Sequence, residues 1–492
     1  MTIALRLIAT ATAHMSIMLP GVVAAQTVPR LLDAVECPLR HEEWAAGVNV
    51  ECRWLVVPQF RNSQDTAQMR LFVVVLRAAR PTGKPPLVML HGGPGESALL
   101  PMVRWGRGQG TLVRDIVVYD QRGAGLSEPD PCPGYAARLR DPPAIDGADT
   151  GSRGVLRALA RECVSTMRAR GLDPAAYSTT ENVADLLDLR VALGYDRWDL
   201  YGVSYGARLA LEAMRRDPNG IRAVTLDRPV PPGAVEAEAP LATQRALARV
   251  LAACNRNVEC RTTYPELEQT LLEVYDTLSR APVAVPATDG SSRQIVVDGA
   301  SFVNALRQLL RSREGVAFLP LLLHELRNGD RTRAAGQLTS FGGAGRGRAG
   351  RATFWLVQCY DQYGATYTAD LAAARSMVSR PLSRLADNLQ ECPIWQERSA
   401  KPTEGAPLLS EIPTLVLTGE FDARTPVEFG RRIAANLPHS YLFELPGETH
   451  SPARPSACRA AIIAEFANDP RRRPAAACIA QMPPVAFLTS WP

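Results

Sequence analysis

The stretch LYGVSYGARLAL, residues 200–211, places a serine between two glycines, and the rest of the chain can be interpreted outward from it. An apolar run precedes Ser204 and a helix-like pattern follows it, so a strand is expected to turn into a helix at this serine. Gly-x-Ser-x-Gly in that position is typical of a nucleophile elbow. The alternative is a serine that packs in an ordinary glycine turn, and the position between strand and helix favours the elbow.

Around this stretch, short apolar runs alternate with longer amphipathic ones. Nearly continuous Val, Ile and Leu runs predict strands that are covered on both faces. These runs lie at residues 70–78, 86–92, 114–123, 198–204, 221–230, 412–422 and 440–447. Helices are predicted between strands, for example over 179–194 and 205–220. Because strands alternate with helices, we predict an α/β fold with a mostly parallel central sheet and helices on both faces.

The middle of the chain has a different pattern. Residues 231–408 are rich in helix formers and include a Gly/Arg-rich stretch at 342–351, and strand patterns return only at 412. We therefore expect a helical cap at 231–408, inserted between a first core part at 26–230 and a second at 409–492 with a C-terminal segment. A chain of 492 residues, 46% of them hydrophobic, is long enough for such an insertion.

The N-terminus is predicted to be a signal peptide over residues 1–25. It is apolar and rich in small residues, and Val23 and Ala25 fit the small-residue rule for cleavage after Ala25. An uncleaved membrane anchor is the alternative, although Pro20 interrupts the run. We expect a secreted or periplasmic protein with no stable membrane insertion after cleavage.

The cysteines are consistent with export. The chain has 10 of them and no C-x-x-C pair, which argues against a zinc ribbon or a thioredoxin-like site. In an oxidising compartment disulfides are expected, and buried free thiols are the alternative. The sequence leaves connectivity open, and we expect pairing between nearest neighbours: 37–52, 132–163, 254–260, 359–392 and 458–478.

The charge balance argues against a nucleic-acid partner. The net charge is +5, from 55 basic and 50 acidic residues, and no long Lys/Arg run with interleaved aromatics occurs.

A serine nucleophile needs a base, and the histidines offer one good candidate. His450, in LPGETHSP, directly follows the last predicted strand, where a base is expected if the order is Ser, acid, His. His439 precedes the same strand and is therefore expected at the opposite end of the sheet. His91, in the HGGPG motif, is expected to hold that loop by hydrogen bonds and not to act as a second base. His41 and His324 have no supporting context, and His14 lies in the predicted signal peptide.

The acid and the oxyanion donors are predicted from neighbouring motifs. Asp422, in GEFDARTP after a strand, is our candidate for orienting His450, with Glu420 as its local competitor. The HGGPG motif follows another strand and supplies exposed amides, of which we select that of Gly93. The N–H of Tyr205, directly after the serine, is the second expected donor.

Five motifs, HGGPG, DQRGAGLS, GVSYG, GEFDARTP and GETHSP, together resemble the α/β-hydrolase superfamily. More closely they resemble the secreted tripeptidyl aminopeptidase and proline iminopeptidase group of serine peptidases. The resemblance implies an α/β-hydrolase fold with an inserted helical cap, Ser204 as nucleophile, Asp422 as acid, His450 as base, and Gly93 with Tyr205 as oxyanion donors. GVSYG replaces the GGSWG expected of proline iminopeptidases, which argues against a strict preference for N-terminal proline.

The expected function is that of a secreted serine exopeptidase, which releases short N-terminal peptides or amino acids through an acyl-enzyme. Its substrate is a peptide, or a small-molecule amide or ester, and no metal or organic cofactor is expected. An esterase or other small-molecule hydrolase is the first alternative, because fold does not determine substrate, and a non-catalytic binding protein is the second. Glu96, Glu128, Asp361 and Glu420 are possible partners of a substrate ammonium, although a structural or solvated role is expected for each.

Overall fold

The computed structural model describes most of the chain. The described residues are 29–38, 49–61, 67–99, 101, 113–140, 152–234, 236–287, 294–343, 350–362, 372–373, 375–383, 385, 392–396, 406–451 and 456–492. The predicted signal peptide lies outside them. Within these ranges, no helix combines the length and the apolar character needed to cross a membrane.

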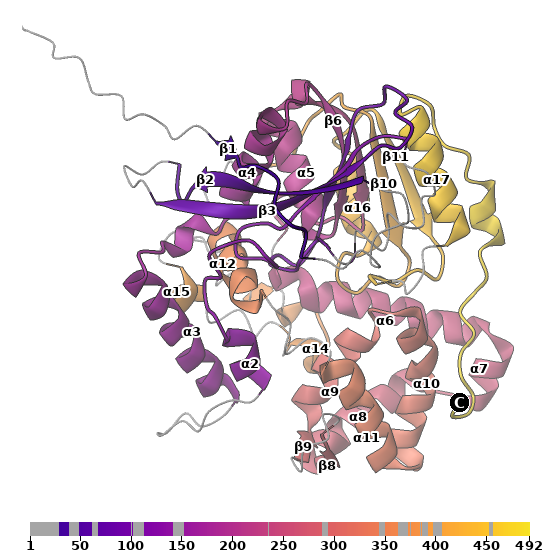
Figure 1. Ribbon diagram of the computed structural model, residues 1–492. Helices are drawn as coiled ribbons and strands as arrows, with labels where there is room; N and C mark the ends of the chain where they lie inside the picture. Colours follow the sequence, from indigo (N-terminus) through magenta and orange to yellow (C-terminus); the bar gives the residue numbers. More distant parts are fainter. Residues whose placement is uncertain are drawn as a thin grey trace, which may run out of the picture.

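In the described part of the chain, a nine-stranded sheet has the order β1-β2-β3-β5-β4-β6-β7-β10-β11 (Figure 1). The strands are β1 (Arg30–Leu31), β2 (Asn49–Pro58), β3 (Gln68–Arg77), β4 (Leu87–Leu90), β5 (Ile116–Tyr119), β6 (Trp198–Val203), β7 (Ile221–Asp227), β10 (Thr414–Gly419) and β11 (Ser440–Leu445). Neighbours from β5 to β11 are parallel, and the pairs β1–β2, β2–β3 and β3–β5 are antiparallel. The predicted α/β fold with a mostly parallel sheet is confirmed, whereas β1 and β2 were not predicted.

Helices cover both faces of the sheet, as the apolar strand patterns predict. All residues of β4, β5 and β10 are buried. In β10, Leu415 and Leu417 belong to a cluster with Ile462 of helix α17 (Ala457–Asn468). The intervening Val416 belongs instead to a cluster with Ile433 of α16 (Val427–Ala434), because alternate side chains of a strand point to opposite faces. Two further helices, α4 (Thr179–Ala192) and α5 (Tyr205–Arg216), contribute to the α16 side.

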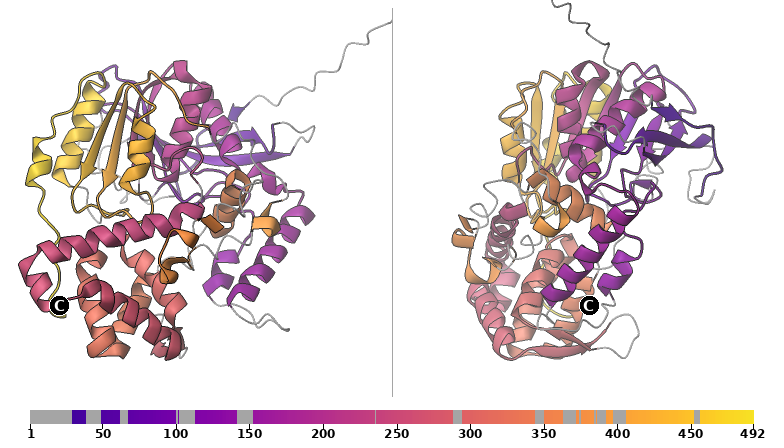
Figure 2. Two further views of the ribbon diagram at one scale, coloured as in Figure 1. Left: turned by 180° about the vertical axis from the view of Figure 1, so that it is seen from behind. Right: turned by 90° about the vertical axis from the view of Figure 1, so that its left-hand side faces the viewer.

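The segment between β7 and β10 is mainly helical. Its helices α6 (Ala239–Arg256), α7 (Val258–Thr263), α8 (Leu267–Arg280), α9 (Gly299–Leu309), α10 (Arg313–Asn328) and α11 (Arg331–Gly343) surround a separate hydrophobic cluster. Figures 1 and 2 show these helices together below the sheet. A short antiparallel pair, β8 (Val283–Pro286) and β9 (Gln294–Val297), joins them, and the sequence patterns did not reveal it.

The later part of this segment packs on the core. Helix α12 (Arg351–Gln362) and helix α15 (Cys392–Trp395) contribute Leu356, Val357 and Trp395 to the main core cluster. They lie against α2 (Tyr135–Arg140) and α3 (Ser152–Ala169), which connect β5 to β6. Helix α12 therefore belongs to the core that carries the sheet.

The disulfides follow the expected nearest-neighbour pattern. The pairs are Cys37–Cys52, Cys132–Cys163, Cys254–Cys260, Cys359–Cys392 and Cys458–Cys478. They account for all 10 cysteines of the chain, so the predicted pairing is confirmed. Five disulfides are typical of a protein that folds in an oxidising compartment.

Candidate functional site

Ser204 lies in the sharp turn between β6 and α5. Its backbone has φ 56° and ψ −117°, a region that residues with a side chain rarely adopt. A Cβ on Gly206 would lie 2.0 Å from the carbonyl oxygen of Leu90, and one on Gly202 would lie 2.5 Å from that of Gly206. The two glycines therefore allow strand and helix to approach at a distance that no larger residue permits. The geometry is that of the predicted nucleophile elbow.

Asp422 and His450 lie together, each on a loop that follows a parallel strand. Nδ1 of His450 is 2.9 Å from Oδ2 and 3.1 Å from Oδ1 of Asp422. The buried carboxylate also accepts hydrogen bonds from the N–H groups of Arg424 (2.7 Å) and Thr425 (2.9 Å), and from the Thr425 hydroxyl (2.7 Å). Because β6, β10 and β11 are parallel strands of one sheet, Ser204 and this pair all lie at its carboxyl edge.

The surroundings of the pair favour a carboxylate beside a neutral imidazole. Burial opposes the charge on Asp422, but His450 and the Thr425 hydrogen bonds hold the pKa of the carboxyl below its ordinary value. Burial lowers the pKa of His450, although the nearby carboxylate acts in the opposite direction. Since the carboxylate only accepts, the proton lies on Nδ1 and leaves Nε2 as the basic atom.

The structure gives the competing carboxylates other contacts. Glu420 accepts the N–H of Gly447 at 2.8 Å, so Asp422 and not Glu420 contacts His450. Glu128 forms an ion pair with Arg70. Asp361 accepts hydrogen bonds from the hydroxyl (2.5 Å) and the N–H (3.2 Å) of Thr179, and Glu96 lies half-buried on the HGGPG loop. All four candidate ammonium partners therefore have interactions within the protein.

The HGGPG loop passes beside Ser204. A Cβ on Gly92 would lie 2.9 Å from Cβ and 3.4 Å from Oγ of Ser204. The next residue is Gly93, whose φ of 115° favours glycine. Tyr205 is the first residue of α5, where a backbone N–H has no partner within the helix. Of the two residues selected as oxyanion donors, Tyr205 therefore directly follows Ser204, and Gly93 directly follows Gly92, which lies against Ser204.

Asp120, the first residue of the DQRG motif, connects this loop to the loop after β5. Its buried carboxylate accepts hydrogen bonds from the N–H groups of Ala98 (2.7 Å) and Leu126 (2.8 Å), and from the hydroxyl of Ser97 (3.2 Å). Burial raises the pKa of this carboxyl to about 6. The motif was visible in the sequence, but the role of its aspartate was not predicted.

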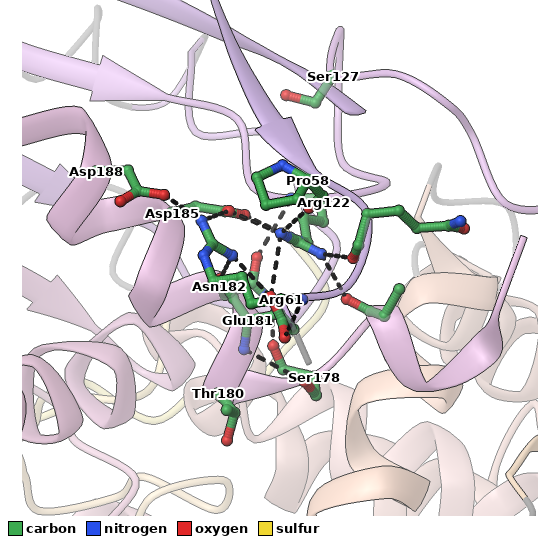
Figure 3. Close-up of polar contacts among 12 residues, drawn as sticks. Pro58, Arg61, Arg122, Ser127, Ser178, Thr180, Glu181, Asn182, Asp185 and Asp188 are labelled. Atoms are coloured by element: carbon green, nitrogen blue, oxygen red, sulfur yellow. Dashed lines mark hydrogen bonds and ion pairs between the residues drawn. The ribbon is translucent and has the colours of Figure 1, made fainter. Parts of the chain in front are cut away.

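Arg122 of the same motif anchors the β5 loop to the core (Figure 3). Its buried guanidinium forms a two-point ion pair with Asp185 of α4 and donates to the carbonyls of Pro58 (2.9 Å) and Ala176 (3.1 Å). Arg61 adds a second ion pair to Asp185, at 2.8 Å. These contacts attach the loop after β5 to α4 and to the end of β2.

Among the described residues, no group of three or more His, Cys, Asp or Glu side chains is arranged to hold a metal ion.

A serine on a strand-to-helix turn, with an Asp–His pair after two later strands of the same parallel sheet, is the arrangement of an α/β hydrolase. Residues 85–453, which include all these groups, match the alpha/beta hydrolase fold family, and the chain belongs to that family.

Several relatives with peptidase names share parts of the sequence. The tripeptidyl aminopeptidase of Streptomyces lividans is 28% identical over 222 residues, 43% of this chain and 41% of that enzyme. A serine protease of Mycobacterium tuberculosis is 33% identical over 188 residues, 35% of this chain and 36% of the protease. The proline iminopeptidase of Xanthomonas citri is 32% identical over 143 residues, 29% of this chain and 31% of the enzyme. In each case the match spans less than half of the relative.

Proposed function

We propose that this chain is an exported serine hydrolase, and that it acts as an exopeptidase on the N-termini of short peptides. The observation that carries the proposal is the buried Asp422–His450 pair, at the same edge of the sheet as Ser204 in its strained turn. The names of the relatives support a peptidase, because they are a tripeptidyl aminopeptidase, a serine protease and a proline iminopeptidase.

In the proposed reaction, Nε2 of His450 takes the proton of the Ser204 hydroxyl while Oγ attacks the scissile carbonyl carbon. Asp422 stabilises the resulting imidazolium and holds its orientation. The N–H groups of Gly93 and Tyr205 stabilise the oxyanion, each contributing about 3 kcal/mol to lowering the barrier.

The imidazolium then protonates the leaving amine, and an acyl-enzyme forms on Ser204. Water, deprotonated by the same imidazole, attacks this ester and releases the acyl product, so that the serine is regenerated.

We further propose that helices α6 to α11, which lie between β7 and β10, form a cap that restricts the site to short or unfolded peptides. Their separate hydrophobic cluster supports a distinct unit beside the core. A cap of this kind also excludes water from the reacting groups while substrate is bound.

The proposal is tested with chromogenic amides of one, two and three residues, each with a free and with a blocked amine, alongside p-nitrophenyl esters. Amide turnover that is lost when the amine is blocked supports the exopeptidase. Ester turnover alone would identify an esterase, and neither turnover nor labelling by a fluorophosphonate would indicate a binding protein. The Ser204→Ala variant should lose both activities, whereas Ser340→Ala, on the exposed surface of α11, should keep them.

Export is tested separately. Expression of the full chain in a bacterial host should yield a periplasmic or secreted protein whose first residue is Gln26. An intact N-terminus in the membrane fraction would show an uncleaved anchor instead.

A further inference from the structure

The segment from Asp227 to Val230 lies where β7 ends, between the strands that lead to the proposed reacting groups. On one side, the carbonyl of Asp227 accepts the N–H of Ser204 (3.0 Å), and the N–H of Val230 donates to the Ser204 carbonyl (3.3 Å). On the other side, the N–H of Arg228 donates to the carbonyl of Leu417 in β10 (2.8 Å). The backbone of this segment therefore contacts the nucleophile turn and the strand that leads to Asp422.

The side chain of Arg228 extends these contacts to the histidine loop. Its Nε donates to the carbonyl of Thr449 at 2.6 Å, and Thr449 directly precedes His450. Its Nη2 donates to the carboxylate of Glu448, and its Nη1 donates to that of Asp227 at 3.0 Å. One guanidinium thus holds both residues that precede the proposed base.

The two carboxylates that Arg228 contacts each have further partners. The second oxygen of Asp227 accepts the hydroxyl of Tyr201 (2.6 Å) and pairs with Arg459 of α17. The second oxygen of Glu448 accepts the hydroxyl of Ser456 at 2.8 Å. Two arginines thus balance two carboxylates in a buried network, and such a network restricts movement because every charge has partners.

The backbone at Arg228 indicates that this arrangement is imposed by its surroundings. Its φ is 50°, a left-handed value that is uncommon for a residue with a side chain, and only 3% of the side chain is exposed. A strained residue of this kind persists where neighbouring contacts determine it. A lysine there would provide a compact ammonium in place of a planar fork, and could not make the same three contacts.

We propose that Arg228 is a positioning residue, which holds the His450 loop relative to Ser204. The inference rests on the proposed function, in which His450 is the base for Ser204. Because the Asp227–Val230 segment is bonded to the backbone of Ser204 and the Arg228 side chain to that of Thr449, a shift of Arg228 changes the geometry between base and nucleophile. The alternative is a buried ion cluster that only stabilises the fold.

The test compares Arg228→Lys with Arg190→Lys. Arg190 is the matched control because it also bonds one carboxylate, Asp217 (2.9 Å), and two carbonyls, those of Tyr195 (2.9 Å) and Asp196 (2.8 Å), near the amino edge of the sheet. Both variants should lower Tm. Arg228→Lys should also reduce kcat by about 10- to 100-fold with little change in KM, as expected for a displacement of about 1 Å at reacting groups. Arg190→Lys should keep kcat within about twofold of the wild-type value, because Arg190 is not expected to contact the site.

A second readout does not depend on substrate. The low-field proton resonance of the His450 Nδ1–H, identified by its absence in His450→Ala, should shift or broaden in Arg228→Lys and remain in place in Arg190→Lys. If Arg228→Lys does not fold, the same measurements are made on the double variant Arg228→Gln/Glu448→Gln. In this variant position 448 carries a neutral amide, so removing the arginine leaves no unpaired carboxylate there.

Four outcomes are distinguishable. An unchanged kcat and resonance in the Arg228 variant overturn the inference, and so does an equal loss of kcat in Arg190→Lys. Failure of both Arg228 variants to fold also overturns it, because the arginine is then a fold determinant. A wild-type protein that is neither labelled by a fluorophosphonate nor active overturns the proposed function, and with it the inference.

Discussion

The proposed base is an imidazole that burial keeps neutral. The pKa of His450 lies below its ordinary value of 6.5, because desolvation of the charged form outweighs the attraction of Asp422. Only the neutral imidazole can accept the proton of Ser204, so a lowered pKa extends the active form towards acidic pH.

We therefore predict that kcat/KM for an uncharged ester is constant at neutral pH and falls only below pH 6.5, the ordinary pKa of histidine. The measurement is a pH profile with a substrate that has no titrating group. A half-maximal rate above that pH would contradict the burial described for His450.

Asp422 provides a second prediction at this scale. In Asp422→Asn the neutral amide no longer stabilises the imidazolium and can force the wrong tautomer, so kcat should fall by about 10⁴-fold. The matched control is Glu420→Gln, on the same loop, whose amide oxygen can still accept the N–H of Gly447. Steady-state kinetics should show near wild-type activity for this control. Comparable losses of kcat in both variants would contradict the assignment of Asp422 as the acid that orients His450.

At the scale of elements, the site depends on loops that buried side chains hold in place by hydrogen bonds. Asp120 bonds the backbone N–H groups of Ala98 and Leu126 and thereby joins the loop after β4 to the loop after β5. The loop after β4 carries Gly93, so the position of this loop determines where the proposed oxyanion donor at Gly93 points.

For Asp120→Ala we predict a loss of roughly 2–4 kcal/mol in the free energy of unfolding, since buried N–H groups lose a charged acceptor. We also expect a fall in kcat. Asp115→Ala is the control, because Asp115 lies at the opposite end of β5 and accepts the N–H of Ala78 at 2.9 Å. Denaturant unfolding and kinetics of both variants measure the two effects. Equal kinetic losses would contradict a specific role for Asp120.

At the scale of the whole molecule, α12 connects the inserted segment to the site. Gly350, just before α12, contacts Gly95 of the HGGPG loop so closely that a Cβ on Gly350 would lie 1.7 Å from the Gly95 carbonyl oxygen. At the other end of the helix, Asp361 bonds Thr179, whose hydroxyl lies 2.8 Å from that of Tyr205. The disulfide Cys359–Cys392 links α12 to α15.

Removing this disulfide should destabilise the protein more than removing the shortest one. Its cysteines are 33 positions apart, whereas those of Cys254–Cys260 are 6 apart. Loop-closure entropy predicts losses of about 4 and about 2 kcal/mol, respectively, for the double serine variants. Thermal unfolding of both variants provides the comparison. A larger loss for the shorter loop would show that native contacts, and not loop closure, dominate.

The sequence by itself determined the parallel part of the sheet, the elbow at Ser204 and the nearest-neighbour disulfides. These features depend on residues close in the chain: continuous apolar runs, glycines beside a serine, and cysteines at short separations. The motifs also pointed to Asp422 and His450, which the fold brings into contact, while their catalytic roles remain predictions.

Only the tertiary structure decided what holds the site in place. Strand β2 and the β8–β9 pair were missed because they become regular only when they pair with a partner strand. The roles of Asp120 and Arg228 were invisible for a related reason: the partners of a buried charge are set by folding, and Arg228 meets Glu448 across 220 positions of sequence. A charged residue in a sequence looks the same whether water or another buried charge will surround it.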